Sequence, residues 1–259
     1  MLPEVVPQGF LEKLDRVYQT GEPFIGRAMP IQLQRVANGE LEQRFIDLIY
    51  QPILDESGNV TGIFVQGNDV TEAYQLAQEV SYQAAHDSLT GLSNRRDFAE
   101  KTDNLPSAGP HALLYMDIDH FKIVNDRCGH AAGDQLLKEV ASAIAHQCQS
   151  DDVLARLGGD EFALVRWNCG REDSAALAES LRRAVKDIDF VWKSRRYGVT
   201  LSVGIACFGE AGAGATEQAL GLADAACFLA KEKGRNRTQI SSTTDEEVNR
   251  PGFAGGRFF

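Results

Sequence analysis

The segment RLGGDEFA at residues 156–163 decides the fold of the larger part of this chain. It overlaps two apolar runs, VLARL at 153–157 and FALVRW at 162–167, which have the length and composition of strands. Two strands joined by a short glycine-containing connection predict a β-hairpin. The segment is therefore expected to form the tip of a hairpin within a sheet.

The tip carries more than a turn requires. Gly158 and Gly159 can adopt the positive φ of a tight turn and leave room for a ligand beside the backbone. A turn alone needs neither Asp160 nor Glu161, the two acids that follow. The simpler interpretation is an acidic, solvated hairpin tip. The alternative is a binding site at the tip, and a second group of acids upstream supports it.

Asp117 and Asp119 end the apolar stretch HALLYMDID. Alternation along a strand puts both side chains on one face. A buried carboxylate is costly unless a cation or several donors compensate it; Asp119 also suits the N-cap of the following helix. If this strand lies beside the hairpin, Asp117 and Asp160 face each other across the pleat. Two carboxylates and a backbone carbonyl would then form an oxygen site that suits Mg²⁺.

From Asp87 onward, amphipathic helices alternate with strands, which predicts an α+β fold of ferredoxin-like or palm type, a central mostly antiparallel sheet flanked by helices. The expected helices lie at 95–104, 121–127, 132–148, 172–188 and 216–233, and the expected strands at 111–118, 153–157, 161–167, 190–208 and near 237–241.

The preceding part of the chain predicts a smaller unit. A short helix at 10–19 is followed by three strand-like runs separated by the turn signals ANGE and DESGN, which predicts a small antiparallel sheet. A polar helix over 72–86 leaves this sheet and places Ala73, Leu76 and Val80 on one stripe. Such a stripe suits pairing with a second copy of the chain.

The bulk composition narrows the function classes. The 259 residues are 43% apolar and 24% charged, with a formal net charge of −11. This charge argues against nucleic acid or an anionic membrane as the main partner, because both require a basic surface. No membrane span or signal peptide is apparent, and five dispersed cysteines predict neither zinc nor a disulfide framework. A cytoplasmic location is therefore expected.

Several motifs together resemble the GGDEF domain, the diguanylate cyclase module. RLGGDEF resembles its signature, and HDSLTGLSNRRDF (86–98) resembles its D-x-L-T-G-L-x-N-R opening. MDIDHFKIVNDRCGHAAGDQLL (116–137) is similar to the segment D-I-D-x-F-K-x-x-N-D-x-x-G-H-x-x-G-D. LSVGIA (201–206) and AKEKGRN (230–236) resemble the closing strand and the K-x-x-G-R-N motif. The resemblance spans residues 84–241 in the family's order.

The resemblance implies an enzyme that condenses two GTP molecules, one on each of two facing domains of a homodimer, to cyclic di-GMP and two pyrophosphates. It implies Mg²⁺ or Mn²⁺ as cofactor, with Asp117, Asp160, Glu161 and the carbonyl of Ile118 as ligands. A metal pair lowers the pKa of an attacking hydroxyl and stabilises charge on the α-phosphate. Glu161 is expected either as a ligand of the second metal or as the general base, and both roles stay open.

Substrate binding follows from the same resemblance. Asn125 and Asp134 would read guanine, because a carboxylate accepts the two N–H groups of that base edge, whereas adenine offers no such pair. Cationic side chains and the glycines of the turn would bind the phosphates. The substrate-binding residues are then Asn125, Asp134, Lys122, Lys231, Arg235, Gly158 and Gly159, and the catalytic residues are Asp160, Glu161 and Lys122.

The N-terminal part resembles the second half of a PAS sensor domain, in TGEPF and in YQPILDESGNVTGIFVQGNDVTE. In that family an Asp–Thr pair, here Asp69 and Thr71, ties the sheet to the outgoing helix. A PAS domain starts with two strands and several short helices, for which too few residues precede Phe10. We therefore expect an incomplete sensor without a full small-molecule pocket, and with a sheet edge that is free to pair.

The expected organisation has four parts and two possible functions. A partial PAS-like sensory domain at 1–71 precedes a helical signalling linker at 72–86, a GGDEF catalytic domain at 87–241 and a disordered tail at 242–259. The first function is a diguanylate cyclase regulated by the PAS-like segment, whose product acts on cyclic di-GMP receptors. The alternative is a signalling scaffold that binds nucleotide without turnover. Degenerate members usually lose the signature acids, which are all present here.

One family pattern is broken. Many members carry a product-inhibition motif R-x-x-D shortly before the signature, and this chain has QSDD at 149–152. Asp152 is in place, but Gln149 stands where the arginine is expected. An amide cannot replace the charge and fork geometry of a guanidinium. We therefore expect weak or absent feedback by cyclic di-GMP.

Overall fold

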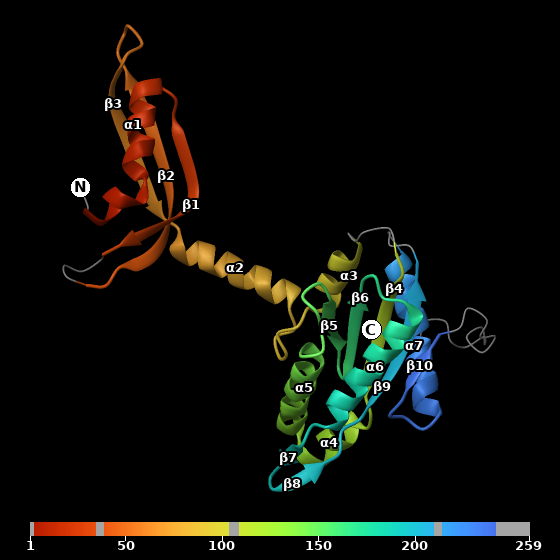
Figure 1. The fold of residues 1–259 in the computed structure, drawn as a ribbon. Helices are drawn as coiled ribbons and strands as arrows, with labels where there is room; N and C mark the ends of the chain where they lie inside the picture. The colour runs from red at the N-terminus through yellow and green to blue at the C-terminus, as the bar shows by residue number, and fades with distance from the viewer. Residues whose placement is uncertain (1–2, 35–38, 104–108, 210–213, 242–259) are drawn as a thin grey trace. The chain divides into compact units, whose positions relative to one another are not determined.

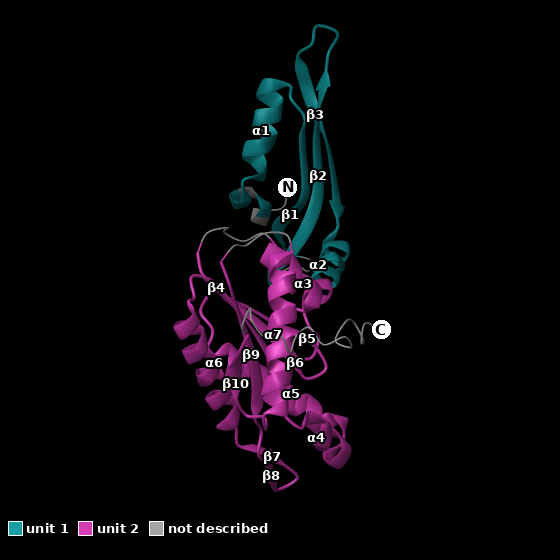
Figure 2. Ribbon diagram, turned by 90° about the vertical axis from the view of Figure 1, so that its right-hand side faces the viewer, with its two compact units in different colours: residues 1–82 teal, residues 83–259 magenta. Residues whose placement is uncertain are grey.

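The structure is a computed structural model that describes residues 3–34, 39–103, 109–209 and 214–241. The chain divides into two compact units, Met1–Tyr82 and Gln83–Phe259, which are coloured separately in Figure 2. The tail that was expected to be disordered lies outside the described residues.

Unit 1 is a three-stranded antiparallel sheet with a helix packed on one face (Figure 1). The expected strand runs are all observed, in the order β1-β2-β3. The elements are the short 3₁₀ helix η1 (Pro3–Gln8), α1 (Phe10–Thr20), β1 (Phe24–Leu33), β2 (Glu42–Leu54) and β3 (Val60–Asp69). Phe10 and Val17 of α1 pack against Ile31, Leu48 and Tyr50 of the sheet.

The end of unit 1 is fixed to the helix α2 (Thr71–Ala85) by the expected Asp–Thr contact. The Asp69 carboxylate accepts hydrogen bonds from the backbone N–H of Thr71, at 2.9 Å, and from its hydroxyl. The Thr71 hydroxyl oxygen in turn accepts from the backbone N–H of Phe45 at 2.9 Å. The start of α2 is therefore tied to two strands of the sheet.

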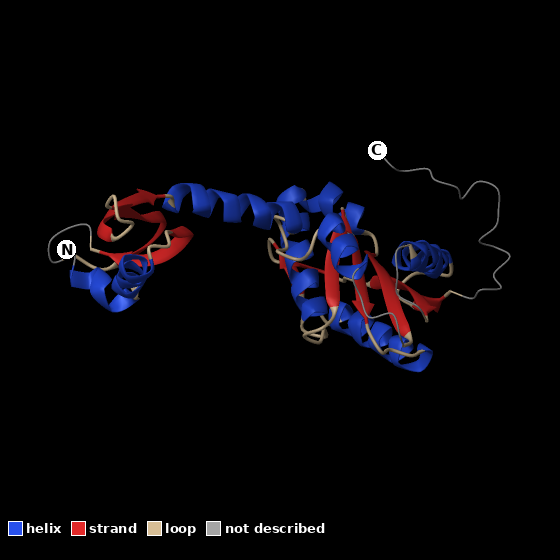
Figure 3. Cartoon of the chain, turned by 90° about the horizontal axis from the view of Figure 1, so that it is seen from above, coloured by secondary structure: helices blue, strands red, loops and turns tan. Residues whose placement is uncertain are grey.

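Unit 2 is a five-stranded sheet of order β10-β9-β4-β6-β5 with helices on both faces, which confirms the predicted α+β fold (Figure 3). All neighbouring strands are antiparallel except β10, which runs parallel to β9. The region expected as one strand at 190–208 is a small hairpin followed by a long strand. The elements are α3 (Arg95–Asp103), β4 (His111–Ile118), α4 (Phe121–Cys128), α5 (His130–Ala145), β5 (Val153–Gly158), β6 (Glu161–Arg166), α6 (Arg171–Lys186), β7 (Phe190–Trp192), β8 (Arg195–Tyr197), β9 (Leu201–Phe208), α7 (Ala215–Glu232) and β10 (Thr238–Ile240).

Strand β4 lies at the centre of this sheet, and all eight of its residues are buried. Side chains alternate between the two faces of a strand. Leu114 and Met116 therefore join the core formed with α5 and α6, whereas Leu113 and Tyr115 join the core formed with α3 and α7. The packing of β4 thus fixes the position of Asp117 at the C-terminal end of the central strand.

Within the described ranges, no helix combines the length and apolar character that crossing a bilayer requires.

Candidate active site

Asp117 lies at the end of β4 and is only 6% exposed. The strand register places it opposite Glu161 of β6 on one side and Ser202 of β9 on the other. The expectation that Asp160 would face Asp117 across the pleat is therefore wrong, because Glu161 occupies that position. Asp160 lies in the turn, where its carbonyl accepts a hydrogen bond from the N–H of Ile118 at 3.3 Å.

The turn before Glu161 has the backbone that its glycines permit. Gly158 and Gly159 adopt φ values of 149° and 52°, in the region that favours glycine. A β-carbon on either residue would meet nothing within 4 Å, so the turn borders open space. The turn therefore leaves a ligand free access to the acids beside it.

Arg156, which sequence reasoning treated as part of an apolar run, holds this turn in place. Its guanidinium donates to the carbonyl of Gly159 at 3.0 and 2.7 Å and to the carboxylate of Asp87 at 3.0 and 3.1 Å. It thus connects the turn to the segment that follows α2. A charged residue inside a short strand run was the available signal.

Asp117 and Asp160 are largely shielded from solvent and lie close to other acids. Burial, together with the charges of Asp160 and Glu161, raises the pKa of Asp117 to about 6, although Lys231 acts in the opposite direction. Lys231 of α7 forms an ion pair with Asp117 at 2.5 Å. Burial also raises the pKa of Asp160. Additional positive charge at this edge would therefore be stabilising.

Glu161 has neighbours that sequence reasoning did not find. Arg95 of α3 lies 4.0 Å from its carboxylate. Burial and the charge of Glu161 raise the pKa of Tyr115 far above its usual range. Burial, again with the charge of Glu161, raises the pKa of Asp224. These groups come from distant segments. Arg95 ends the D-x-L-T-G-L-x-N-R motif, but nothing in that motif indicates its proximity to Glu161.

The donor set fits a hard divalent cation in part. No group of three or more His, Cys, Asp or Glu side chains arranged for a metal ion occurs among the described residues. Asp117 and Asp160 nevertheless supply carboxylate oxygens beside the backbone of Ile118, and burial is the main reason that the pKa of each is raised. Such oxygen donors suit Mg²⁺ or Mn²⁺ when ligand oxygens complete the coordination.

Asp119 does not cap α4, which corrects one of the interpretations above. The N-cap residue is His120, and it makes no capping hydrogen bond through its side chain. The Asp119 carboxylate instead accepts hydrogen bonds from the hydroxyls of Thr200 and Ser202, at 2.7 and 2.6 Å, and from the N–H of Asn236 at 2.9 Å. Asp119 therefore ties β9 and the end of the α7 segment to the site.

The two residues expected to read guanine come from the neighbouring helices α4 and α5. The side-chain oxygen of Asn125 is buried and has no hydrogen-bond partner among the described residues. A β-carbon on Gly133 would lie 1.9 Å from that oxygen, so the helices approach closely there. Asp134, the next residue, is exposed. An unsatisfied buried acceptor beside an exposed carboxylate suits a ligand that offers N–H donors.

Two of the cationic side chains predicted to bind phosphate, Lys122 and Arg235, do not contact the acids of the site in the described part of the chain. Lys122 is exposed on the first turn of α4, and Arg235 is exposed beyond the end of α7 with a φ of 60°. Within the described part of the chain, neither side chain forms a hydrogen bond or an ion pair. Only Lys231 of the three contacts the acids of the site.

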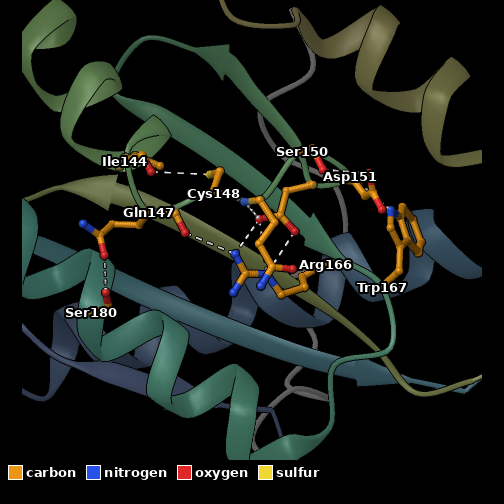
Figure 4. A network of polar contacts seen from close by, with 10 residues as sticks. Ile144, Gln147, Cys148, Ser150, Asp151, Arg166, Trp167 and Ser180 are labelled. Carbon is orange, nitrogen blue, oxygen red and sulfur yellow. Dashed lines mark hydrogen bonds and ion pairs between the residues drawn. The ribbon is translucent and has the colours of Figure 1, made fainter.

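The loop before β5, where the inhibitory motif was sought, is closed by an internal ion pair (Figure 4). Arg166 of β6 grips the Asp152 carboxylate through two nitrogens, with a shortest distance of 2.5 Å, and also donates to the carbonyl of Gln147. The backbone N–H of Gln149 donates to the same carboxylate at 2.8 Å. The Asp152 side chain is only 2% exposed.

Comparison with known proteins agrees with this architecture. The family model described as "Diguanylate cyclase, GGDEF domain" matches residues 84–237. The probable diguanylate cyclase DgcE of Escherichia coli is 39% identical over 194 residues, which cover 73% of this chain and 18% of that protein. The cyclic di-GMP phosphodiesterase PdeB of Shewanella oneidensis is 35% identical over 228 residues, covering 86% of this chain and 26% of that protein. The chain thus spans a minor part of these longer relatives.

Among solved structures, the coiled coil and GGDEF domain of DgcB from Caulobacter crescentus, in complex with c-di-GMP, has a TM-score of 0.58 and 28% identity. The match covers 66% of this chain and 93% of that chain.

Proposed function

The chain belongs to the GGDEF family of diguanylate cyclases, and we propose that it condenses two GTP molecules to cyclic di-GMP and two pyrophosphates. The observation that carries the proposal is the buried Asp117, opposite Glu161 and paired with Lys231 at the open end of the sheet. Burying a carboxylate costs free energy, and a hairpin tip with only a structural role would not require it. Acids with perturbed pKa values are concentrated at functional sites.

The residues divide the chemistry between them. Asp117, Asp160 and the Ile118 carbonyl would hold Mg²⁺ or Mn²⁺, and the bound cation would acidify the 3′-hydroxyl and stabilise charge on the α-phosphate. Lys231 supplies positive charge to the phosphates, and the exposed side chains of Lys122 and Arg235 are assigned the same purpose. Glu161 serves as the general base or as a further ligand.

Guanine recognition is assigned to the α4–α5 pair. Among the described residues the buried oxygen of Asn125 has no donor, and the carboxylate of Asp134, which follows Gly133 in α5, can accept two N–H groups. Adenine lacks the matching donors, so the site is expected to reject ATP as a substrate.

One domain holds one GTP, so turnover requires two domains that face each other in a homodimer. Unit 1, which resembles part of a PAS domain, would regulate how two copies meet, and its contacts with α2 through Asp69 and Thr71 support this role.

The purified chain, incubated with GTP and Mg²⁺ and analysed by chromatography, is expected to yield cyclic di-GMP and pyrophosphate. The rate should rise more steeply than linearly with protein concentration, and ATP should give no cyclic product. Tight GTP binding without any product would identify the chain as the nucleotide-binding scaffold instead.

A further inference from the structure

Unit 2 has a hollow that lies outside the residues assigned to catalysis. It has a volume of about 570 Å³ and is lined by Arg127, Arg195, Arg196 and Tyr197. Arg127 belongs to the last turn of α4, and the other three residues form β8. None of the four has a role in the proposed cyclase reaction.

The charge of this hollow is largely uncompensated. Arg196 forms an ion pair with Asp189 at 3.2 Å, with an arginine side chain that is 78% exposed. The side chains of Arg127 and Arg195 form no hydrogen bond or ion pair within the described ranges. Like charges that share a hollow repel one another, and an anion relieves that repulsion. The arrangement is unusual in a chain whose formal net charge is −11.

The β7–β8 hairpin, which carries Arg195 and Arg196, has an ordered and well-packed backbone. The β7–β8 hairpin is anchored by Phe190, which is fully buried and lies 6.3 Å from the Tyr197 ring. Its two-residue loop, Lys193 and Ser194, adopts φ values of 46° and 64°, as tight hairpin turns require. The arginines therefore project from a fixed backbone.

The same hairpin holds another unsatisfied donor. Trp192 is the cross-strand partner of Arg195, and its buried indole Nε1 has no acceptor among the described residues. Buried donors normally have an acceptor. Trp192 packs against the core and is not among the residues that line the hollow. The two unpaired guanidinium groups by themselves call for a ligand that is rich in acceptor oxygens.

We propose that this hollow binds a ligand with at least two phosphate groups. Guanidinium groups bind phosphate oxygens in bidentate geometry, and several of them can engage linked phosphates at once. The volume lies in the range of nucleotide-sized sites. Free pyrophosphate and a nucleotide share this chemistry, but only a nucleotide has a base to place against the Tyr197 ring.

Calorimetric titration of the full chain with pyrophosphate and with ATP, in the presence of EDTA, tests the proposal. The double variant R127A/R195A should bind pyrophosphate at least about tenfold more weakly than the wild type. The matched control R16A/R171A removes two exposed arginines elsewhere, with the same change in net charge, and should bind within twofold of the wild type. Circular dichroism verifies that both variants are folded.

The two sources are separated by Tyr197→Leu. A loss of affinity for ATP alone identifies a nucleotide site, and unchanged affinity for both probes identifies a pyrophosphate site. The proposal is overturned if pyrophosphate does not bind the wild type at millimolar concentration, or if the control loses as much affinity as R127A/R195A.

Discussion

At the scale of single residues, Asp117 combines burial with a charge that the fold only partly compensates. Lys231 lowers its pKa, but burial and two neighbouring acids prevail and raise that pKa from 3.8 to about 6. A group whose pKa is raised on folding favours the folded state most at low pH. This contribution is present below pH 4 and is lost as the pH rises through 6.

This titration predicts a pH-dependent stability difference between the wild type and Asp117→Asn, which cannot ionise. From pH 4 to pH 7 in EDTA, the unfolding free energy of the wild type should fall relative to that of the variant by roughly 2–3 kcal/mol. Urea unfolding at several pH values measures the difference. A difference that stays constant with pH would show that Asp117 keeps an ordinary pKa.

The acids of the turn should matter for turnover and little for the fold. Asp160→Ala and Glu161→Ala are each expected to lower cyclic di-GMP formation by at least about a hundredfold, because either change removes a carboxylate from the reacting edge. The turn borders open space, so thermal unfolding should change little. Glu172→Ala, an exposed acid at the start of α6, is the control and should keep wild-type activity. Wild-type activity in either turn variant would refute the site.

Some residue positions were predictable from the sequence and others were not. The acid at the end of β4 was identified because a carboxylate closing an apolar strand is rare. Its partner was misplaced, because the regular β4–β6 register sets Asp117 opposite Glu161, the first residue of β6, and leaves Asp160 in the turn. Asp119 was misassigned as a possible cap because its donors come from residues 200, 202 and 236, far along the chain.

At the scale of elements, the packing of α7 on β9 positions Lys231 beside Asp117. A β-carbon on Gly204 would lie 1.9 Å from the carbonyl oxygen of Ala223 and 2.3 Å from the backbone nitrogen of Cys227. Backbone atoms cannot move aside as a flexible side chain can. The helix therefore sits on the strand only because residue 204 is glycine.

Gly204→Ala is accordingly expected to destabilise the protein by about 1–3 kcal/mol or more, through overpacking. Gly221→Ala, in the interior of α7 with nothing within 4 Å of the added carbon, should instead stabilise it by about 0.5–1 kcal/mol. Chemical denaturation of both variants measures the contrast. Equal effects would mean that the close helix–strand contact does not limit packing.

The α5–β5 loop predicts how the proposed cyclase would respond to cyclic di-GMP. Gln149 lacks the guanidinium of the usual motif, and the Asp152 carboxylate is already held by Arg166. Cyclic di-GMP titrated against initial rates should therefore inhibit only weakly. Half-inhibition at low micromolar product would contradict this prediction. The missing arginine was visible in the sequence, whereas the contact of Arg166 with Asp152 depends on the pairing of strands and was not.

At the scale of the whole molecule, α2 connects the two units and offers a surface for a second copy. The sequence predicted a stripe of Ala73, Leu76 and Val80 from helical spacing alone. Leu76 and Val80 are 62% and 57% exposed, as expected for a stripe that no other part of the described chain covers. Exposed leucine and valine on one helix face favour association with a like helix.

If this stripe joins two copies, Leu76→Ser with Val80→Ser should weaken the homodimer and lower the specific activity most at low protein concentration. Raising the concentration should restore activity, because the changes leave each half-site intact. Gln78→Ser lies on another face of α2 and serves as the control. Initial rates over a range of protein concentrations, alongside sedimentation, separate the two effects. An equal loss of activity at every concentration would show that α2 acts on catalysis by some route other than assembly.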